Sequence, residues 1–172
     1  MSREVNIVRM VLVALMAALI FVLTAFARIP VPATGGYVHL GDAAITFTAY
    51  AFGPWVALFA GGMGTAMADT LGYPQWAVFS LVIHGLQGLA MGWIVQKRVN
   101  IWTAVLSVVI GAGIVVVGYF AAGTFLTGAA TATLELIPNT IQGVSGGLIG
   151  IPLYLAVRRA YPPLESRSHR TS

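Results

Sequence analysis

The sequence contains no cysteine, and only 8% of its 172 residues are charged. Soluble domains carry about 25% charged residues, so this shortage excludes an ordinary soluble protein. The absence of cysteine excludes disulfides. The sequence also lacks HExxH and GxSxG motifs, a P-loop lysine motif, a Cys–His cluster and paired carboxylates on one predicted helix. We therefore expect a protein that is not an enzyme, with no catalytic residues, no cofactor and no metal site.

The chain is instead rich in apolar residues. Hydrophobic residues make up 58% of the sequence, and the mean hydropathy is +0.88. These values are typical of a multi-pass membrane protein. The net charge of +4 comes from basic residues that flank the apolar runs, so we interpret it as a topology signal rather than a nucleic-acid surface. We expect one membrane domain, residues 1–160, followed by a polar, disordered cytoplasmic tail, residues 161–172.

The apolar runs predict an all-α protein with six transmembrane helices. The predicted spans cover residues 10–27, 42–53, 54–68, 75–96, 101–122 and 134–157. The proline- and glycine-rich stretch 28–41 is expected to be a loop, and residues 123–133 an outer loop.

The uncharged stretch 43–68 reads as either one span or two. Gly53 and Pro54 divide it, Asp42 is suited to be an N-cap, and Pro54 fits a first helical turn. With two spans here, eight of the nine basic residues fall on one side of the membrane and only Arg28 lies opposite. The positive-inside rule therefore favours six spans, a short second helix and both termini in the cytoplasm.

Polar side chains are concentrated in the outer half of the predicted bundle. His84 and Gln87 lie three residues apart on one helical face, and Glu135, Asn139 and Gln142 follow an i, i+4, i+7 pattern on another. Polar groups inside a membrane protein are costly and usually functional. A channel would be polar along its whole length, so this asymmetry predicts an outward-facing pocket that is closed below.

Each of these residues also has a structural interpretation. Glu135 suits a helix N-terminus, and His84 and the amide side chains could bond to neighbouring helices. Asp69 is more simply a cap or loop anchor, and Tyr73 and Trp76 are typical of the membrane interface. The residue pattern alone leaves these alternatives open.

The run YVHLGDAAITFTAYAFGPWVALFAGGMGTAMADTLGYPQWAVFSLVIHGLQGLAMGWI resembles the substrate-specific S components of energy-coupling factor (ECF) vitamin transporters. The similarity rests on an alanine pair in the first helix, a loop ending in HLGD, a short second helix, GP, a glycine-rich third helix ending in AD, and a polar turn. It is greatest to the group that includes riboflavin, pyridoxine and hydroxymethylpyrimidine S components.

The resemblance implies a multi-pass protein of a prokaryotic plasma membrane that binds a vitamin near the extracellular face. It implies a partner T component, which docks on the alanine pair Ala14 and Ala18, and two ATPase subunits. It also implies that the protein topples in the membrane to release its substrate. The substrate-binding residues implied by it are Tyr37, Tyr73, Trp76, His84, Gln87, Glu135, Asn139 and Gln142.

The leading hypothesis is therefore a vitamin-binding subunit of an ECF-type ABC importer. Arg28 is the only basic residue near the predicted pocket, so a flavin, pyridoxine or pyrimidine fits better than an anionic vitamin such as folate. Three alternatives remain: a membrane structural or assembly protein, a membrane enzyme using Glu135 and His84 as acid and base, and a solitary proton-coupled carrier.

Overall fold

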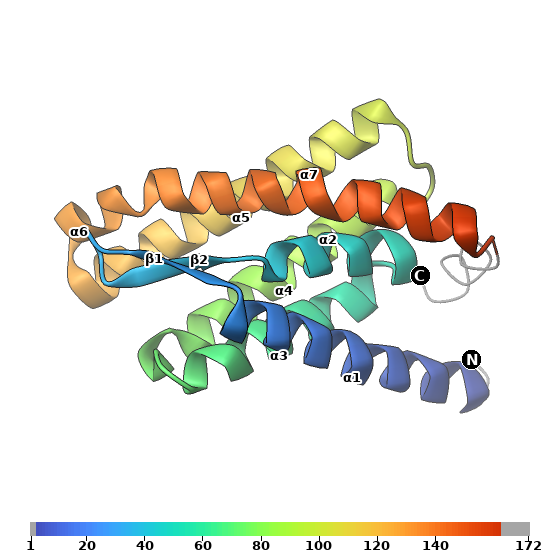
Figure 1. Ribbon diagram of the computed structural model, residues 1–172, viewed down its shortest axis with the longest axis horizontal. Coiled ribbons are helices and arrows are strands. Elements are labelled where there is room, and N and C mark those ends of the chain that lie inside the picture. Colours follow the sequence, from blue (N-terminus) through green and yellow to red (C-terminus); the bar gives the residue numbers. More distant parts are fainter. Residues whose placement is uncertain (1–2, 163–172) are drawn as a thin grey trace.

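The computed structural model describes residues 3–162. Apart from one small antiparallel hairpin, the described chain is helical (Figure 1). The elements are α1 (Arg3–Phe26), β1 (Arg28–Val31), β2 (Gly36–His39), α2 (Gly41–Phe52), α3 (Pro54–Thr70), the 3₁₀ turn η1 (Pro74–Trp76), α4 (Ala77–Val95), α5 (Ile101–Thr127), α6 (Ala129–Leu134) and α7 (Leu136–Ala160). Residues 163–172, most of the predicted tail, lie outside the described part.

Four of the helices, α1, α4, α5 and α7, are long and apolar enough to cross a membrane. Large apolar side chains such as Leu15, Val109 and Leu148 are exposed on them, as expected for contact with lipid. α2 has 12 residues and α3 has 17, so at 1.5 Å per residue they are about 18 and 26 Å long. The chain is thus a helical membrane protein with two further helices that are shorter than the hydrocarbon core of a bilayer.

The break between α2 and α3 lies where the sequence predicts it. Gly53 has a φ of +83°, a conformation that glycine adopts without steric cost, and Pro54 is the first residue of α3. The predicted N-cap is wrong, however. Leu40 occupies the N-cap position of α2 and makes no side-chain cap hydrogen bond, and Asp42 lies inside the first turn with its side chain turned into the bundle. Burial and tertiary hydrogen bonds outweigh the local capping preference of this aspartate.

Helix α2 lies in the middle of the bundle, packed against α1, α3, α4 and α7. Glycines allow the close approach of these helices. A Cβ atom on Gly64 of α3 would lie 2.7 Å from the carbonyl oxygen of Ala17 in α1. A Cβ atom on Gly150 of α7 would lie 2.5 Å from the carbonyl oxygen of Ala43 in α2. The glycines predicted as packing surfaces therefore allow the helices of the core to pack closely.

The hairpin, η1 and α6 lie at one end of the bundle, and the start of α1 and the end of α7 lie at the other (Figure 1). Residues 28–40 contain no helix, as predicted, whereas Gly41, predicted in the same loop, is the first residue of α2. β1 pairs with β2 from Arg28 opposite His39 to Val31 opposite Gly36. The prediction of a loop at residues 123–133 is wrong. It is helical except at Gly128, whose φ of +90° separates α5 from α6, because its small alanine and threonine residues tolerate a helix.

Candidate ligand-binding site

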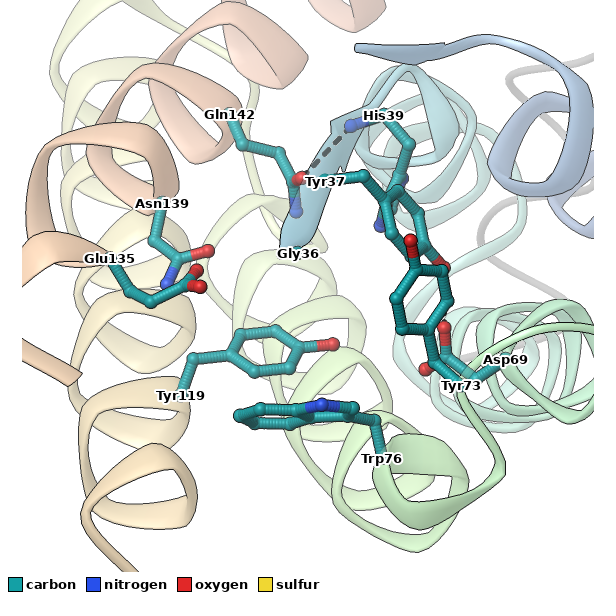
Figure 2. Close-up of a pocket in the computed structure, with 10 residues that line it drawn as sticks. All are labelled: Gly36, Tyr37, His39, Asp69, Tyr73, Trp76, Tyr119, Glu135, Asn139 and Gln142. Carbon is teal, nitrogen blue, oxygen red and sulfur yellow. Dashed lines mark hydrogen bonds between the residues drawn. The ribbon is translucent and has the colours of Figure 1, made fainter. Parts of the chain in front are cut away.

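A cavity of about 50 Å³ lies at the hairpin end of the bundle, between β2, the α3–α4 turn, α5 and α7 (Figure 2). Aromatic and polar side chains dominate its wall. The lining residues are Gly36, Tyr37, His39, Asp69, Tyr73, Trp76, Tyr119, Glu135, Asn139 and Gln142.

Six of the eight substrate-binding residues predicted from the sequence line this cavity. The six are Tyr37, Tyr73, Trp76, Glu135, Asn139 and Gln142. The other two, His84 and Gln87, do not line it; they are fully buried in an adjacent hydrogen-bond network. Glu135 lies between α6 and α7, Asn139 lies in the first turn of α7, and Tyr73 and Trp76 come from the turn before α4.

Four lining residues were not among those predicted. His39 and Asp69 belong to the HLGD and AD patterns, so the sequence carried a signal for them. Gly36 lies in the hairpin, where a Cβ atom would lie 3.0 Å from Oε1 of Glu135. Tyr119 lies in the mostly apolar helix α5, and no periodic pattern of polar residues marks it.

Asp69 fixes the hairpin to the bundle. Its carboxylate accepts hydrogen bonds from the hydroxyl groups of Tyr37 in β2 and Ser80 in α4. Ser80 then accepts one from the phenol of Tyr119 in α5, at 2.6 Å. Burial, and then the bond to Asp69, raise the pKa of Tyr37, so its phenol remains a hydrogen-bond donor. Asp69 is therefore the loop anchor that the sequence suggested, and it also lines the cavity.

Arg28 stabilises the base of the hairpin and does not line the cavity. Its Nε donates to the carbonyl oxygen of Thr24 and its Nη2 to that of Ala68, both at 2.9 Å. Its guanidinium lies 4.4 Å from the centre of the Tyr37 ring, close enough for a cation–π contact. The wall of the cavity consequently contains two carboxylates, those of Asp69 and Glu135, and no lysine or arginine.

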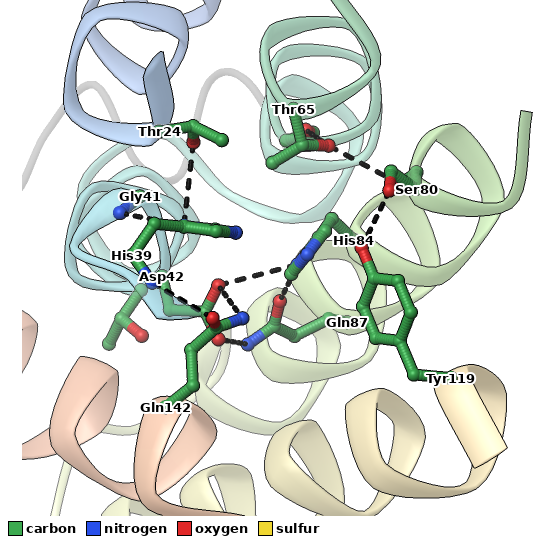
Figure 3. Close-up of polar contacts among 12 residues, drawn as sticks. Thr24, His39, Gly41, Asp42, Thr65, Ser80, His84, Gln87, Tyr119 and Gln142 are labelled. Atoms are coloured by element: carbon green, nitrogen blue, oxygen red, sulfur yellow. Dashed lines mark hydrogen bonds and ion pairs between the residues drawn. The ribbon is translucent and has the colours of Figure 1, made fainter. Parts of the chain in front are cut away.

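Behind the wall formed by His39 and Gln142 lies a buried network centred on Asp42 (Figure 3). The Asp42 carboxyl group accepts hydrogen bonds from Nε2 of Gln87 at 3.1 Å and Nε2 of Gln142 at 3.4 Å. It also lies 3.4 Å from Nδ1 of His84. The backbone N–H of His39 donates to Oε1 of Gln142 at 3.0 Å. One carboxyl group thus connects α2, α4 and α7, and through Gln142 it holds β2.

His39, Asp42 and His84 are close enough together to be considered as metal ligands, since one candidate atom from each lies within 4.8 Å of the others. Their hydrogen bonds do not fit this. Nδ1 of His39 accepts from the N–H of Gly41 at 3.1 Å, which places the proton of the neutral ring on Nε2. Nδ1 of His84 must donate to the amide oxygen of Gln87, 2.8 Å away. We interpret the cluster as a hydrogen-bond network.

The stability of the protein is expected to fall when the pH drops below about 6.5. Burial, followed by the nearby His84 and Arg28, lowers the pKa of His39, so the folded state keeps this ring neutral. The unfolded chain has a histidine pKa of about 6.5 and binds a proton that the folded state does not. Acidification therefore favours unfolding, by up to about 1.4 kcal/mol per pH unit for this residue.

The melting temperature of detergent-purified protein at pH 7.5 and pH 5.5 measures this effect. The matched variant is His39→Gln, whose side-chain oxygen can still accept from Gly41. It should lose a large part of the pH dependence. The same slope in the variant and the wild type would show that His39 does not carry the effect.

The sequence matches the family model of the ECF-type riboflavin transporter S component over residues 4–159. The chain belongs to this S component family. The resemblance seen in the HLGD, GP and AD patterns is thereby confirmed.

Two curated relatives are similar to this S component along most of its length. One is an uncharacterized protein of Pyrococcus woesei, 42% identical over 145 residues, which are 84% of this chain and 98% of the relative. The other is the thiamine precursor transporter HmpT of Lactococcus lactis subsp. cremoris, 31% identical over 156 residues, which are 90% of each chain.

A solved structure has the same fold. The S component for biotin from an ECF-type ABC transporter superposes with a TM-score of 0.68, covering 94% of this S component and 95% of the other chain. The two sequences are only 16% identical, so this likeness establishes the fold alone.

Proposed function

We propose that this S component captures a vitamin or vitamin precursor outside the cell and delivers it inward as the substrate-binding subunit of an ECF-type ABC importer. The observation that carries the proposal is the cavity at the hairpin end of the bundle, which gathers polar and aromatic side chains in a chain of this family. A binding subunit needs such a cavity, and a membrane structural protein does not.

The distribution of polar groups along the bundle favours capture over free passage. The cavity ends at the buried network around Asp42, where Gln87 and Gln142 fill the space with direct hydrogen bonds. Further along, α7 packs against α2 through Gly146 and Gly150 with no room for a side chain. A channel would keep a polar path open here, so the chain needs a conformational change to release its ligand inward.

The orientation that fits this function has six spans, with α2 and α3 as the second and third. The start of α1 and the end of α7 lie at one end of the bundle, opposite the hairpin (Figure 1). Basic residues lie near that end of the chain's helices: Arg9, Lys97, Arg98, Arg158 and Arg159. The positive-inside rule then puts both termini in the cytoplasm and the cavity at the extracellular face of the plasma membrane.

The substrate class follows from the wall of the cavity and from the relatives. Trp76, Tyr119 and Tyr73 offer aromatic surface to a flat ring. The family model is named for riboflavin and one relative for a thiamine precursor. A flavin, a pyridoxine or a pyrimidine is therefore the substrate type we propose.

A thermal-shift screen of the purified protein against water-soluble vitamins and their precursors tests this function. A ligand that binds the folded state alone should stabilise it by about 4 kcal/mol at a thousandfold excess over Kd. Folate serves as an anionic control that should give no shift. No shift with any compound would favour the assembly-protein hypothesis, and uptake into vesicles without an ATPase would favour a solitary carrier.

The docking surface that we propose for the T component is the exposed face of α1. Ala14 and Ala18 are both exposed, whereas Ala17 and Ile20 point into the bundle. Among the described residues, the alanine pair thus lies on the outer surface of the bundle. Small residues at a spacing of four allow another helix to approach closely in a membrane. The partners are a T component and two ATPase subunits.

Replacing Ala14 with phenylalanine is expected to abolish ATP-driven uptake while ligand affinity stays within about twofold of the wild type. A bulky ring on this face blocks close approach of a partner helix but lies far along α1 from the cavity. Uptake of labelled vitamin by cells that express the T and ATPase subunits measures the first effect, and titration of the purified protein measures the second. Val109→Phe, on an exposed position of α5, is the control. Wild-type uptake by the Ala14 variant would contradict the docking surface.

A further inference from the structure

Ser80 is a buried residue that connects two sides of the cavity wall without lining the cavity itself. It lies in the first turn of α4 and is fully buried. Its backbone carbonyl oxygen accepts from Oγ1 of Thr65 in α3 at 3.3 Å, and its hydroxyl group bonds to Tyr119 in α5 (Figure 3). The same hydroxyl bonds to Asp69 at the end of α3. Ser80 thus joins three helices beside the cavity.

The direction of these hydrogen bonds follows from the carboxylate of Asp69. A carboxylate only accepts, so the Ser80 hydroxyl donates to it, and Tyr119 must then donate its phenol proton to Ser80. The same carboxylate also accepts from Tyr37 of the hairpin. One chain of hydrogen bonds therefore runs from Tyr119, on the α5 side of the cavity, to Tyr37, on the hairpin side.

The Ser80 hydroxyl is used differently from several other hydroxyl groups in these helices. Thr48, Thr124 and Thr140 each donate to the carbonyl oxygen four residues earlier in their own helix. This is a common arrangement for serine and threonine in membrane helices. Among the described residues, the Ser80 hydroxyl makes no bond within α4, and both of its partners lie on other helices. Its hydroxyl therefore serves contacts between helices.

The bonds of such a chain depend on one another. A hydroxyl group that accepts a hydrogen bond is polarised and becomes a better donor, so the bond from Ser80 to Asp69 is strengthened by the bond from Tyr119. Asp69 in turn holds Tyr37, and with it the hairpin. Residues of one hydrogen-bond network are energetically coupled in this way. A change at Tyr119 should therefore be felt at the hairpin.

We propose that Ser80 is a positioning residue for ligand binding, which couples the α5 wall of the cavity to the hairpin. This inference rests on the proposed function of the cavity. A ligand that packs against Tyr119 keeps its phenol on Ser80, and the chain of bonds then holds the hairpin more firmly against the bundle. Without the Ser80 hydroxyl, Tyr119 and the hairpin move independently, and a ligand has to order each of them separately.

Hydrogen–deuterium exchange of the full-length protein in detergent, without ligand, tests the coupling. The readout is the exchange rate of the backbone amides of residues 28–39, which reports local opening of the hairpin. Tyr119→Phe removes the first hydroxyl of the chain and should speed this exchange about 3- to 10-fold, the effect of losing one hydrogen bond. In a Ser80→Ala background, where the chain is already cut, Tyr119→Phe should add about twofold or less.

Ser107→Ala is the matched control. Ser107 is also a fully buried serine bonded to a phenol, that of Tyr50 at 2.7 Å. Among the described residues its only other bond is to the carbonyl oxygen of Ala104, so it has no connection to Asp69. This variant should leave exchange in the hairpin unchanged. If Ser80→Ala does not fold, Tyr37→Phe cuts the chain at its hairpin end, and Tyr119→Phe should again add little in that background.

Calorimetric titration with riboflavin, pyridoxine and 4-amino-5-hydroxymethyl-2-methylpyrimidine measures the effect on binding. Ser80→Ala should weaken the binding of any probe that the wild type binds about 10-fold, whereas Ser107→Ala should stay within about twofold.

Three results would overturn this inference and leave vitamin capture standing. They are equal acceleration of exchange by Tyr119→Phe with and without Ser80, no acceleration in either background, and unchanged affinity in Ser80→Ala. No binding of any probe by the wild type would overturn the proposed function and the ligand-binding role of Ser80, and the exchange rates would then decide the coupling alone.

Discussion

Replacing Asp42 with alanine should lower the free energy of unfolding by about 3 kcal/mol or more and weaken ligand binding. Asp42 is fully buried, and its carboxyl group accepts from Gln87 and Gln142 and lies 3.4 Å from Nδ1 of His84. Alanine leaves these groups without their acceptor in the middle of the bundle. Removing one partner of a buried charged network costs more than the network contributed, because the remaining groups stay desolvated.

The effect on binding follows from Gln142. This residue lines the cavity and holds the backbone of His39 in β2. Without Asp42 both the amide and the strand lose their fixed position, so affinity should fall together with the melting temperature. Asp42→Asn keeps the shape but turns an amide N–H₂ toward other donors, so it should be damaging too.

Thr48→Ala is the matched control for Asp42→Ala. Thr48 lies on the same helix, is equally buried, and donates only to the carbonyl oxygen of Ala44 one turn earlier. Its loss should cost about 0.6–1 kcal/mol, the usual size for such bonds in membrane helices. Melting temperatures and ligand titrations of both variants provide the measurement. Equal losses would show that Asp42 is not the centre of the network.

Replacing Gly146 with alanine is expected to have the second large effect. A Cβ atom on Gly146 would lie 2.5 Å from Cβ of Asp42 and 3.0 Å from its carbonyl carbon. These neighbours belong to the buried helix α2 and cannot rotate away, so α7 has to move. Forced overpacking of a core typically costs about 1–3 kcal/mol, and here it also displaces the network that holds Gln142.

Gly113→Ala makes the same chemical change in a membrane helix without the contact. Nothing lies within 4 Å of a Cβ atom built on Gly113 of α5. Since alanine favours a helix by up to about 1 kcal/mol over glycine, this variant should be neutral or slightly more stable. The melting temperatures of the two variants, measured under the same conditions, test this prediction. Similar melting temperatures would mean that α7 and α2 are not in close contact at Gly146.

The parts of the fold that depend on local chemistry could be predicted from the sequence. The turn between α2 and α3 follows from one glycine and one proline, Gly53 and Pro54. The absence of a helix in residues 28–40 follows from the prolines and glycines of this stretch. The concentration of polar residues near one end of the bundle predicted the cavity, because polar groups in apolar helices are costly and usually functional.

The remaining details depend on contacts between helices, which spacing along one helix does not determine. His84 and Gln87 do share a face of α4, but that face meets Asp42 of α2 rather than the cavity. Asp42 looked like a cap because its burial depends on α4 and α7, distant in sequence. Tyr119 gave no signal at all, since its role depends on Ser80 across the helix pair.

The measurement that tests the central claim most directly is a ligand titration followed by the fluorescence of Trp76. Among the four tryptophans of the chain, Trp76 lines the cavity, whereas Trp55, Trp93 and Trp102 lie near the helix ends opposite the hairpin. A variant with these three changed to phenylalanine keeps Trp76 as its only reporter. The converse variant, Trp76→Phe, keeps the other three.

With a vitamin or precursor that raises the melting temperature of both variants, the fluorescence of the Trp76-only variant should change saturably, at concentrations that match the Kd. The converse variant should show no saturable change. Saturable change in the converse variant, with none in the Trp76-only variant, would place the ligand outside this cavity and contradict the account.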